Sequence, residues 1–148
     1  MSADSEVIFN PVEIEEIPAD EAFLQIIGDA VQAGASDVFF TSDADAVRIS
    51  LRHLGVIRPW GEATIETGRR LIGHTKTSTG MDVAERRKPQ DGRRIVSLGE
   101  GKFVDVRANS IPTLFGEDVS IRLFDREHRL LEVSQLGLTL TDFQRLEV

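Results

Sequence analysis

Strict alternation of apolar and polar residues, in two segments joined by a short loop, is the strongest constraint on the fold. Every second residue is apolar in 102–109 and again in 118–124. The apolar positions are Val104, Val106 and Ala108, then Val119, Ile121 and Leu123. A period of two is typical of a strand with one buried face. With Pro112 and Gly116 bounding the loop between them, the pattern predicts two adjacent antiparallel strands.

The rest of the chain adds helices and further strands. An apolar stripe of period about 3.6 predicts a helix over 20–34. A less regular pattern, rich in Thr and Gly, predicts a second helix over 64–78. Further strands are expected at 37–41, 47–51, 56–60 and 94–98, and a turn at 89–92, where Asp-Gly readily takes positive φ. The predicted class is α+β: a mostly antiparallel sheet of five to six strands with helices packed on one side.

Charge is unevenly distributed along the 148 residues. The net of −8 divides into −11 over 1–47, with eleven acids and no Lys or Arg, and +3 over 48–148, where 17 bases face 14 acids. The total argues against broad nucleic-acid binding, while the basic part suits a compact anion such as a phosphate. We expect an acidic linker over 1–18, one domain over 19–137, and a connecting segment over 138–148.

Several chemistries are excluded. The chain has no Cys, so it forms no disulfide, zinc-thiolate site or thiol nucleophile. The only Gly-Lys pair, Gly101-Lys102, lacks the spacing of a phosphate-binding P-loop and is expected to form a hairpin turn. The three His residues lack metal-ligand spacing. No apolar run reaches the ~18 residues of a membrane span, and the first six residues lack the basic region of a signal peptide.

One constellation stands out in the alternating pair. Arg107 lies mid-strand, with Asp105 two residues before it on the same face, and Arg122 lies mid-strand in the next strand. Adjacent strands bring the two guanidinium groups close together. One interpretation is a salt-bridge ladder through Asp105 or another acid. The other is a di-arginine clamp for a phosphate, which suits the rigid fork of arginine.

Several segments, in order, resemble a known family. They are 35–38 (Ala-Ser-Asp-Val), 81–93 (Met-Asp-Val-Ala-Glu-Arg-Arg-Lys-Pro-Gln-Asp-Gly-Arg), 104–113 (Val-Asp-Val-Arg-Ala-Asn-Ser-Ile-Pro-Thr), 115–117 (Phe-Gly-Glu) and 121–124 (Ile-Arg-Leu-Phe). Together they resemble the N-terminal (N2) domain of type II secretion and type IV pilus assembly ATPases, often called GspE or PilB. Residues 131–137 resemble the family's link towards its P-loop.

The resemblance implies a PAS-like domain linked to a RecA-like ATPase domain in a cytoplasmic hexamer at the inner membrane. It implies that Arg107 and Arg122 approach the phosphates of ATP, held with Mg²⁺ by the ATPase domain. Arg93, Asp105 and Glu117 are assigned a supporting or interface role. The implied partners are the ATPase domain, neighbouring subunits and inner-membrane platform proteins, with no nucleic acid and no membrane insertion. This segment alone would be no enzyme, would carry no cofactor and would couple ATP state to domain motion.

The sequence also departs from the family pattern. Phe39, Thr41 and Ser42 stand where the family usually has His, Glu and Pro, and Leu54 replaces the Asp of an Arg-x-Asp-Gly turn. These departures indicate a divergent member. The alternative function is a free-standing PAS-like interaction or ligand-binding module. A P-loop encoded beyond residue 148 would support the role as a domain of an ATPase, and a stop codon there would support this alternative.

Overall fold

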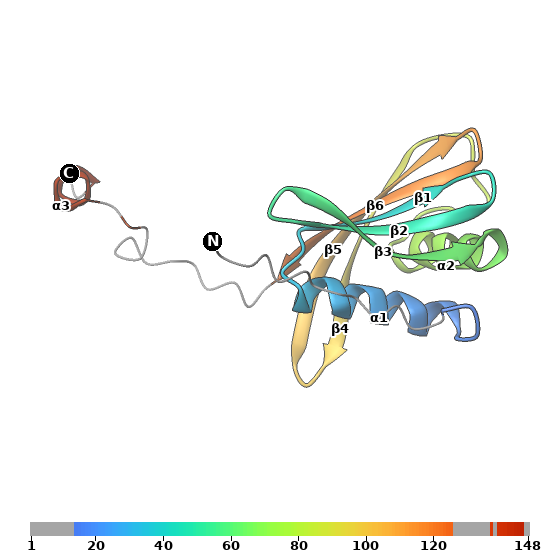
Figure 1. Cartoon of the computed structure of the whole chain (residues 1–148), viewed down its shortest axis with the longest axis horizontal. Helices are drawn as coiled ribbons and strands as arrows, with labels where there is room; N and C mark the ends of the chain where they lie inside the picture. The colour runs from blue at the N-terminus through green and yellow to red at the C-terminus, as the bar shows by residue number, and fades with distance from the viewer. Residues whose placement is uncertain (1–13, 126–136, 138, 147–148) are drawn as a thin grey trace.

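The computed structural model describes residues 14–125, 137 and 139–146. Its body is a single sheet with two long helices (Figure 1). The elements are α1 (Ala19–Gln32), β1 (Asp37–Ser42), β2 (Ala46–His53), β3 (Val56–Thr64), α2 (Ile65–Ser78), β4 (Gln90–Gly99), β5 (Lys102–Thr113), β6 (Gly116–Asp125) and the short α3 (Leu140–Leu146). The expected order of helices and strands in the body is confirmed.

The sheet has six strands in the order β3-β2-β1-β6-β5-β4, and every neighbouring pair is antiparallel. Strands β1–β3 and β4–β6 each follow one another in sequence order. The two sets join where β1 pairs with β6, with Asp37 opposite Arg122. This long-range pairing places residues about 85 positions apart in sequence side by side, and it builds the site described below.

Helices α1 and α2 lie on one side of the sheet (Figure 1). The apolar positions of the alternating strands face them and are buried, as are the apolar residues of α1. The largest fully buried side chains include Phe23, Phe40, Ile26, Ile49 and Leu71. The expected α+β fold with helices on one side is therefore confirmed. The opposite sheet face has no helix on it among the described residues, and it carries the polar positions of the strands.

The turn predicted at 89–92 is absent, because β4 already begins at Gln90. Gly92 is needed there for close approach rather than for positive φ. A Cβ on Gly92 would lie 2.4 Å from the carbonyl oxygen of Thr79. The next residue, Arg93, donates its backbone N–H to that carbonyl at 3.0 Å. This contact fastens the start of β4 to the end of α2.

Two strands are also longer than the alternation suggests. β5 continues to Thr113 and β6 begins at Gly116, so the expected loop shrinks to a tight turn at Leu114 and Phe115. The paired ends bring Glu117 opposite Pro112.

The domain boundaries at 18/19 and 137/138 stay predictions. Residues 1–13 of the expected linker lie outside the described residues. Within 14–18, Ile14 is buried in the core. The carboxylate of Glu15 accepts hydrogen bonds from Thr64 and Thr67 at the start of α2. This short stretch is thus attached to the body by both apolar and polar contacts.

Candidate functional site

A row of charged side chains crosses five strands on the helix-free face of the sheet. Each member lies directly opposite the next in strand register. From β4 to β2 the members are Arg93, Arg107, Arg122, Asp37 and Arg52, which we call the arginine row. Directly opposed residues in an antiparallel pair lie on the same face, close enough to interact. The row therefore concentrates four guanidinium groups and one carboxylate.

Arg107 and Arg122 are neighbours in this row, as the alternation predicts. The guanidinium of Arg107 lies over the ring of Phe124, with its central carbon 4.7 Å from the ring centroid. A cation over an aromatic face gains about 0.5–1 kcal/mol at an exposed site. Among the described residues, no carboxylate forms an ion pair with Arg107.

Arg122 is held differently. Its Nε donates to Oδ1 of Asp37 at 3.1 Å, while its side chain remains 63% exposed. The Asp37 carboxylate is buried, accepts a hydrogen bond from the Ser36 hydroxyl at 2.7 Å and faces Nε of Arg52 at 3.7 Å. Arg52 in turn lies over the ring of Phe39, 5.2 Å from its centroid. Asp37 thus neutralises the crowded cations at the centre of the sheet.

At the other end of the row, Arg93 binds Asp105 through two parallel hydrogen bonds, from Nε at 2.9 Å and from Nη2. The hydrogen bonds that Arg93 donates to the Asp105 side chain, together with the charge of that carboxylate, raise the pKa of Arg93. Asp105 therefore supports Arg93 and does not lie between Arg107 and Arg122. Ion pairs account for Arg93 and Arg122, and the described residues supply none for Arg107. The phosphate clamp stays a prediction.

A shallow hollow of about 230 Å³ opens beside the two central arginines. Arg107 and Arg122 line it together with Asp37, Asp91, Asn109, Ser120 and Phe124. The amide of Asn109 donates to Asp91 at 2.9 Å on the rim of this hollow. Two guanidinium groups suit an oxyanion, because arginine presents several donors in a fixed fork. The carboxylates of Asp37 and Asp91 also line the hollow, so an anion there would compete with them for the arginines.

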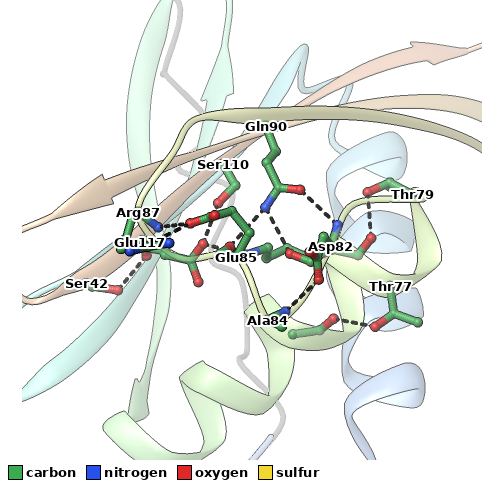
Figure 2. A network of polar contacts seen from close by, with 12 residues as sticks. Ser42, Thr77, Thr79, Asp82, Ala84, Glu85, Arg87, Gln90, Ser110 and Glu117 are labelled. Atoms are coloured by element: carbon green, nitrogen blue, oxygen red, sulfur yellow. Dashed lines mark hydrogen bonds and ion pairs between the residues drawn. The ribbon is translucent and has the colours of Figure 1, made fainter.

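Glu117, to which the sequence assigned a supporting or interface role, lies on the helix-covered face of the sheet. Its carboxylate binds Lys76 of α2 at 2.6 Å and accepts from Ser110 at 3.0 Å. Figure 2 shows Glu117 beside Ser42 and Ser110, at the end of the sheet. There the hydroxyl of Ser42 donates to the backbone carbonyl of Glu117 at 2.7 Å. Glu117 therefore supports the β5–β6 hairpin and does not reach the arginine row.

The loop between α2 and β4 is held by a polar network of its own (Figure 2). The amide of Gln90 bonds the backbone of Asp82 on both sides, donating to its carbonyl at 2.9 Å and accepting from its N–H at 2.8 Å. The same amide nitrogen donates to the carbonyl of Glu85 at 3.0 Å. These hydrogen bonds fix the backbone conformation of the loop within segment 81–93, the segment that resembles the family.

Sequence reasoning missed Asp37, Arg52 and Phe124 as members of the site. Phe124 was visible in the alternation as the next polar-face position after Arg122. Asp37 and Arg52 were hidden because they belong to the other half of the chain. Only the β1–β6 pairing brings them beside Arg122.

Two departures from the family pattern have structural explanations. Phe39, at the usual His position, supplies the ring on which Arg52 lies. Ser42, at the usual Pro position, uses a backbone N–H that proline lacks, donating to Asp118 at 2.8 Å. Both residues therefore make contacts that the more usual residue would not make in the same way.

Within the described residues there is no group of three or more His, Asp or Glu that could hold a metal ion. Across that same part of the chain, no helix is long and apolar enough to cross a membrane.

Solved structures share this fold. The Legionella pneumophila ATPase DotB matches 92% of this chain and 37% of its own, with a TM-score of 0.67 and 13% identity. The pilus retraction motor PilT, solved with bound ADP, matches 84% of this chain and 35% of its own, with a TM-score of 0.52 and 23% identity. The six-stranded sheet with two helices is thus a fold shared with DotB and PilT.

The family model described as Type II/IV secretion system protein matches residues 13–148, and the chain belongs to this family. The type IV pilus assembly ATPase PilB of Acinetobacter baylyi is 33% identical over 123 residues, covering 83% of this chain and 21% of the relative. The type II secretion system ATPase E of Vibrio cholerae is 32% identical and covers 99% of this chain and 32% of the relative. The chain spans between about a fifth and a third of these relatives' lengths.

Proposed function

We propose that this chain is the N2 domain of a hexameric secretion or pilus assembly ATPase, and that Arg107 and Arg122 contact the phosphates of bound nucleotide. ATP and Mg²⁺ would be held mainly by a P-loop ATPase domain outside these residues. In this role the domain couples nucleotide state to domain position. Neighbouring subunits and inner-membrane platform proteins would be its further partners, at the cytoplasmic side of the membrane.

The opposed pair Arg107 and Arg122 on the open sheet face is the observation that carries the proposal. Both side chains are exposed beside one hollow, and Arg107 has no carboxylate partner among the described residues. Two adjacent cations repel one another, so an anion bridging them relieves an unfavourable arrangement. The family membership suggests which anion this is, since the PilB and type II secretion relatives are named as ATPases.

The chemistry follows from charge. The γ-phosphate adds negative charge that is lost on hydrolysis and phosphate release, and arginine side chains sense such a change through charge-assisted hydrogen bonds. A domain that offers two guanidinium groups is attracted to the nucleotide before hydrolysis and released after it. The sheet carries the arginines rigidly, because both lie mid-strand and opposite one another.

The test is ATP turnover by the full-length ATPase that contains this sequence. Arg107→Ala and Arg122→Ala should each lower kcat/KM roughly 10- to 150-fold, since a hydrogen bond to a charged group contributes about 1.5–3 kcal/mol. Arg94→Ala is the matched control. Arg94 is also exposed on β4, but it lies opposite Val106, on the other face of the sheet.

Turnover within twofold of the parent protein for both Arg107→Ala and Arg122→Ala, in folded hexamers, would contradict the proposal. An equal loss in Arg94→Ala would also contradict it, because the effect would then be one of surface charge and not of position in the arginine row.

A further inference from the structure

Asp37 lies between two arginines and binds them unequally. It opens β1, and its register neighbours are Arg122 on β6 and Arg52 on β2. Its side chain is only 9% exposed. A buried carboxylate needs a compensating charge and hydrogen bonds, and this one has a cation on each side.

The two carboxylate oxygens are divided between the neighbours. Oδ1 accepts from Nε of Arg122 at 3.1 Å, which is a hydrogen bond. Oδ2 accepts from the Ser36 hydroxyl and lies 3.7 Å from Nε of Arg52, which is beyond hydrogen-bonding distance. Asp37 is therefore bonded to Arg122 and only close to Arg52.

Arg52 has an unused donor at this position. Its Nε is buried and has no hydrogen-bond partner among the described residues. A buried donor without a partner costs about 1–3 kcal/mol. A shift of less than an ångström by the Asp37 carboxylate towards Arg52 would form a hydrogen bond to this donor and remove that cost. The ring of Phe39 beneath Arg52 keeps that guanidinium in place to receive it.

We propose that Asp37 is a resident counter-ion of the arginine row, exchanged between Arg122 and Arg52. Without a bound anion, Asp37 neutralises Arg122. When a phosphate engages Arg107 and Arg122, Asp37 moves away from the incoming negative charge and closes the hydrogen bond to Nε of Arg52. This inference rests on the proposed phosphate site and adds to it a response on β2, beyond the hollow.

The exchange has a consequence that a purely structural carboxylate would lack. An anion must compete with Asp37 for Arg122, so removing the charge of Asp37 should tighten anion binding. Loss of a merely structural carboxylate would disorder Arg122 and weaken binding instead. Asp37→Asn retains the shape of the side chain and removes its charge, and it separates these two outcomes.

The experiment follows the arginine Nε–H groups of the 148-residue chain by NMR during titration with inorganic tripolyphosphate at low ionic strength. We expect the signals of Arg107, Arg122 and Arg52 to shift along one binding curve, although Arg52 does not line the hollow. Arg48 is the control within the same spectrum. It lies on β2 like Arg52, but its Nε is bonded to Asp43 at 3.3 Å, and its signal should stay in place.

Variants complete the test. Asp37→Asn should bind tripolyphosphate three- to tenfold more tightly and should abolish the Arg52 shift. Arg52→Lys keeps the charge but has no Nε–H donor, and it should weaken binding several-fold. Asp43→Asn, which removes an exposed carboxylate outside the row, should leave the affinity within twofold.

The outcomes are distinguishable. If Arg107 and Arg122 fail to respond to tripolyphosphate, the proposed phosphate site itself is overturned. If they respond while Arg52 stays unchanged, the exchange is overturned and the phosphate site stands. Weaker tripolyphosphate binding by Asp37→Asn would likewise overturn the exchange, because it would show that Asp37 helps the anion to bind.

Discussion

Lys76 and Glu117 form a buried ion pair, with Nζ 2.6 Å from Oε1 and side chains 1% and 10% exposed. The same ammonium group donates to the backbone carbonyl of Glu85 at 2.7 Å. Lys76 therefore joins three parts of the molecule: α2, the loop before β4 and the β5–β6 hairpin. That hairpin carries both central members of the arginine row.

Replacing Lys76 with Met should destabilise the fold by about 3–5 kcal/mol, because Glu117 would be left as a buried charge without its partner. Urea unfolding monitored by circular dichroism measures the change. Lys88→Met, at an exposed lysine, should change the free energy of unfolding by less than about 0.5 kcal/mol. If the double variant Lys76→Met, Glu117→Leu is no more stable than Lys76→Met alone, the unpaired carboxylate is not the cause.

Glu15 should make the attachment of residues 14–18 sensitive to acid. The side-chain hydrogen bond from Thr67, followed by the backbone N–H of Thr64, lowers the pKa of Glu15 below its ordinary 4.5. Its contribution is fully present above pH 4.5 and is lost as the pH falls through the lower folded-state pKa. Because Glu15 is exposed, the contribution should be below about 1 kcal/mol.

Chemical unfolding of the parent chain and Glu15→Gln, compared at pH 7 and pH 3, tests this assignment. The parent should be the more stable at pH 7, and the two curves should approach one another at pH 3. A difference that is independent of pH would contradict the role of the carboxylate charge. Glu16→Gln, at an exposed neighbouring glutamate, is the control.

His74 should give the helix pair a second pH dependence, nearer neutrality. Burial, chiefly, and then the nearby charge of Arg94 lower the pKa of His74 below 6.5, against an opposing effect of Asp20. The folded state thus favours the neutral ring, which packs against Phe23 at 5.3 Å between centroids. Its contribution is full above pH 6.5 and is lost as the pH falls from 6.5 towards the folded-state pKa.

Thermal unfolding of the parent chain between pH 7.5 and pH 5.5 measures the His74 effect. The midpoint of His74→Gln should fall less over this range than that of the parent chain. Equal slopes in the two proteins would remove His74 as the cause. His53→Gln, at a histidine outside the contact between α1 and α2, should keep the parent slope.

Local patterns were sufficient to predict every element of the body and the position of Arg107 beside Arg122. Alternation determines which strand face is buried, and short connections determine which strands pair within each half. Both signals are local in sequence, so neither indicates how the two halves join. The β1–β6 pairing, and with it the contact of Asp37 with Arg122, depends on the global packing of the sheet on its two helices.

The turn predicted at 89–92 was wrong for a related reason. Asp-Gly is compatible with positive φ, but the glycine of the pair also allows a close backbone contact that a Cβ would prevent. The proximity of Thr79 to Gly92 comes from the end of α2, thirteen residues earlier in the chain. The sheet face that Glu117 occupies follows in the same way from strand register, which its local sequence does not indicate.

Replacing Leu54 should increase the stability of the fold. It has φ of 48° in the β2–β3 turn, a left-handed conformation that is unfavourable for leucine. Its side chain is 87% exposed, so no burial compensates for this strain. Leu54→Asn should raise the free energy of unfolding by about 1 kcal/mol, since Asn adopts this conformation readily. Leu114→Asn is the control, at an exposed leucine in another turn but without positive φ. No gain in the thermal midpoint of Leu54→Asn would contradict the strain.

Phe124 should determine how well Arg107 is presented to an anion. Its ring holds the Arg107 guanidinium at 4.7 Å on the open face, and removing it frees the long side chain to sample other rotamers. In the full-length ATPase, Phe124→Leu should lower kcat/KM about two- to fivefold, and Phe124→Tyr should retain the parent value. Phe103→Leu is the control because Phe103 is an exposed phenylalanine of β5 and its ring lies under neither Arg107 nor Arg52. Equal turnover by Phe124→Leu and the parent enzyme would show that Arg107 needs no aromatic support to act.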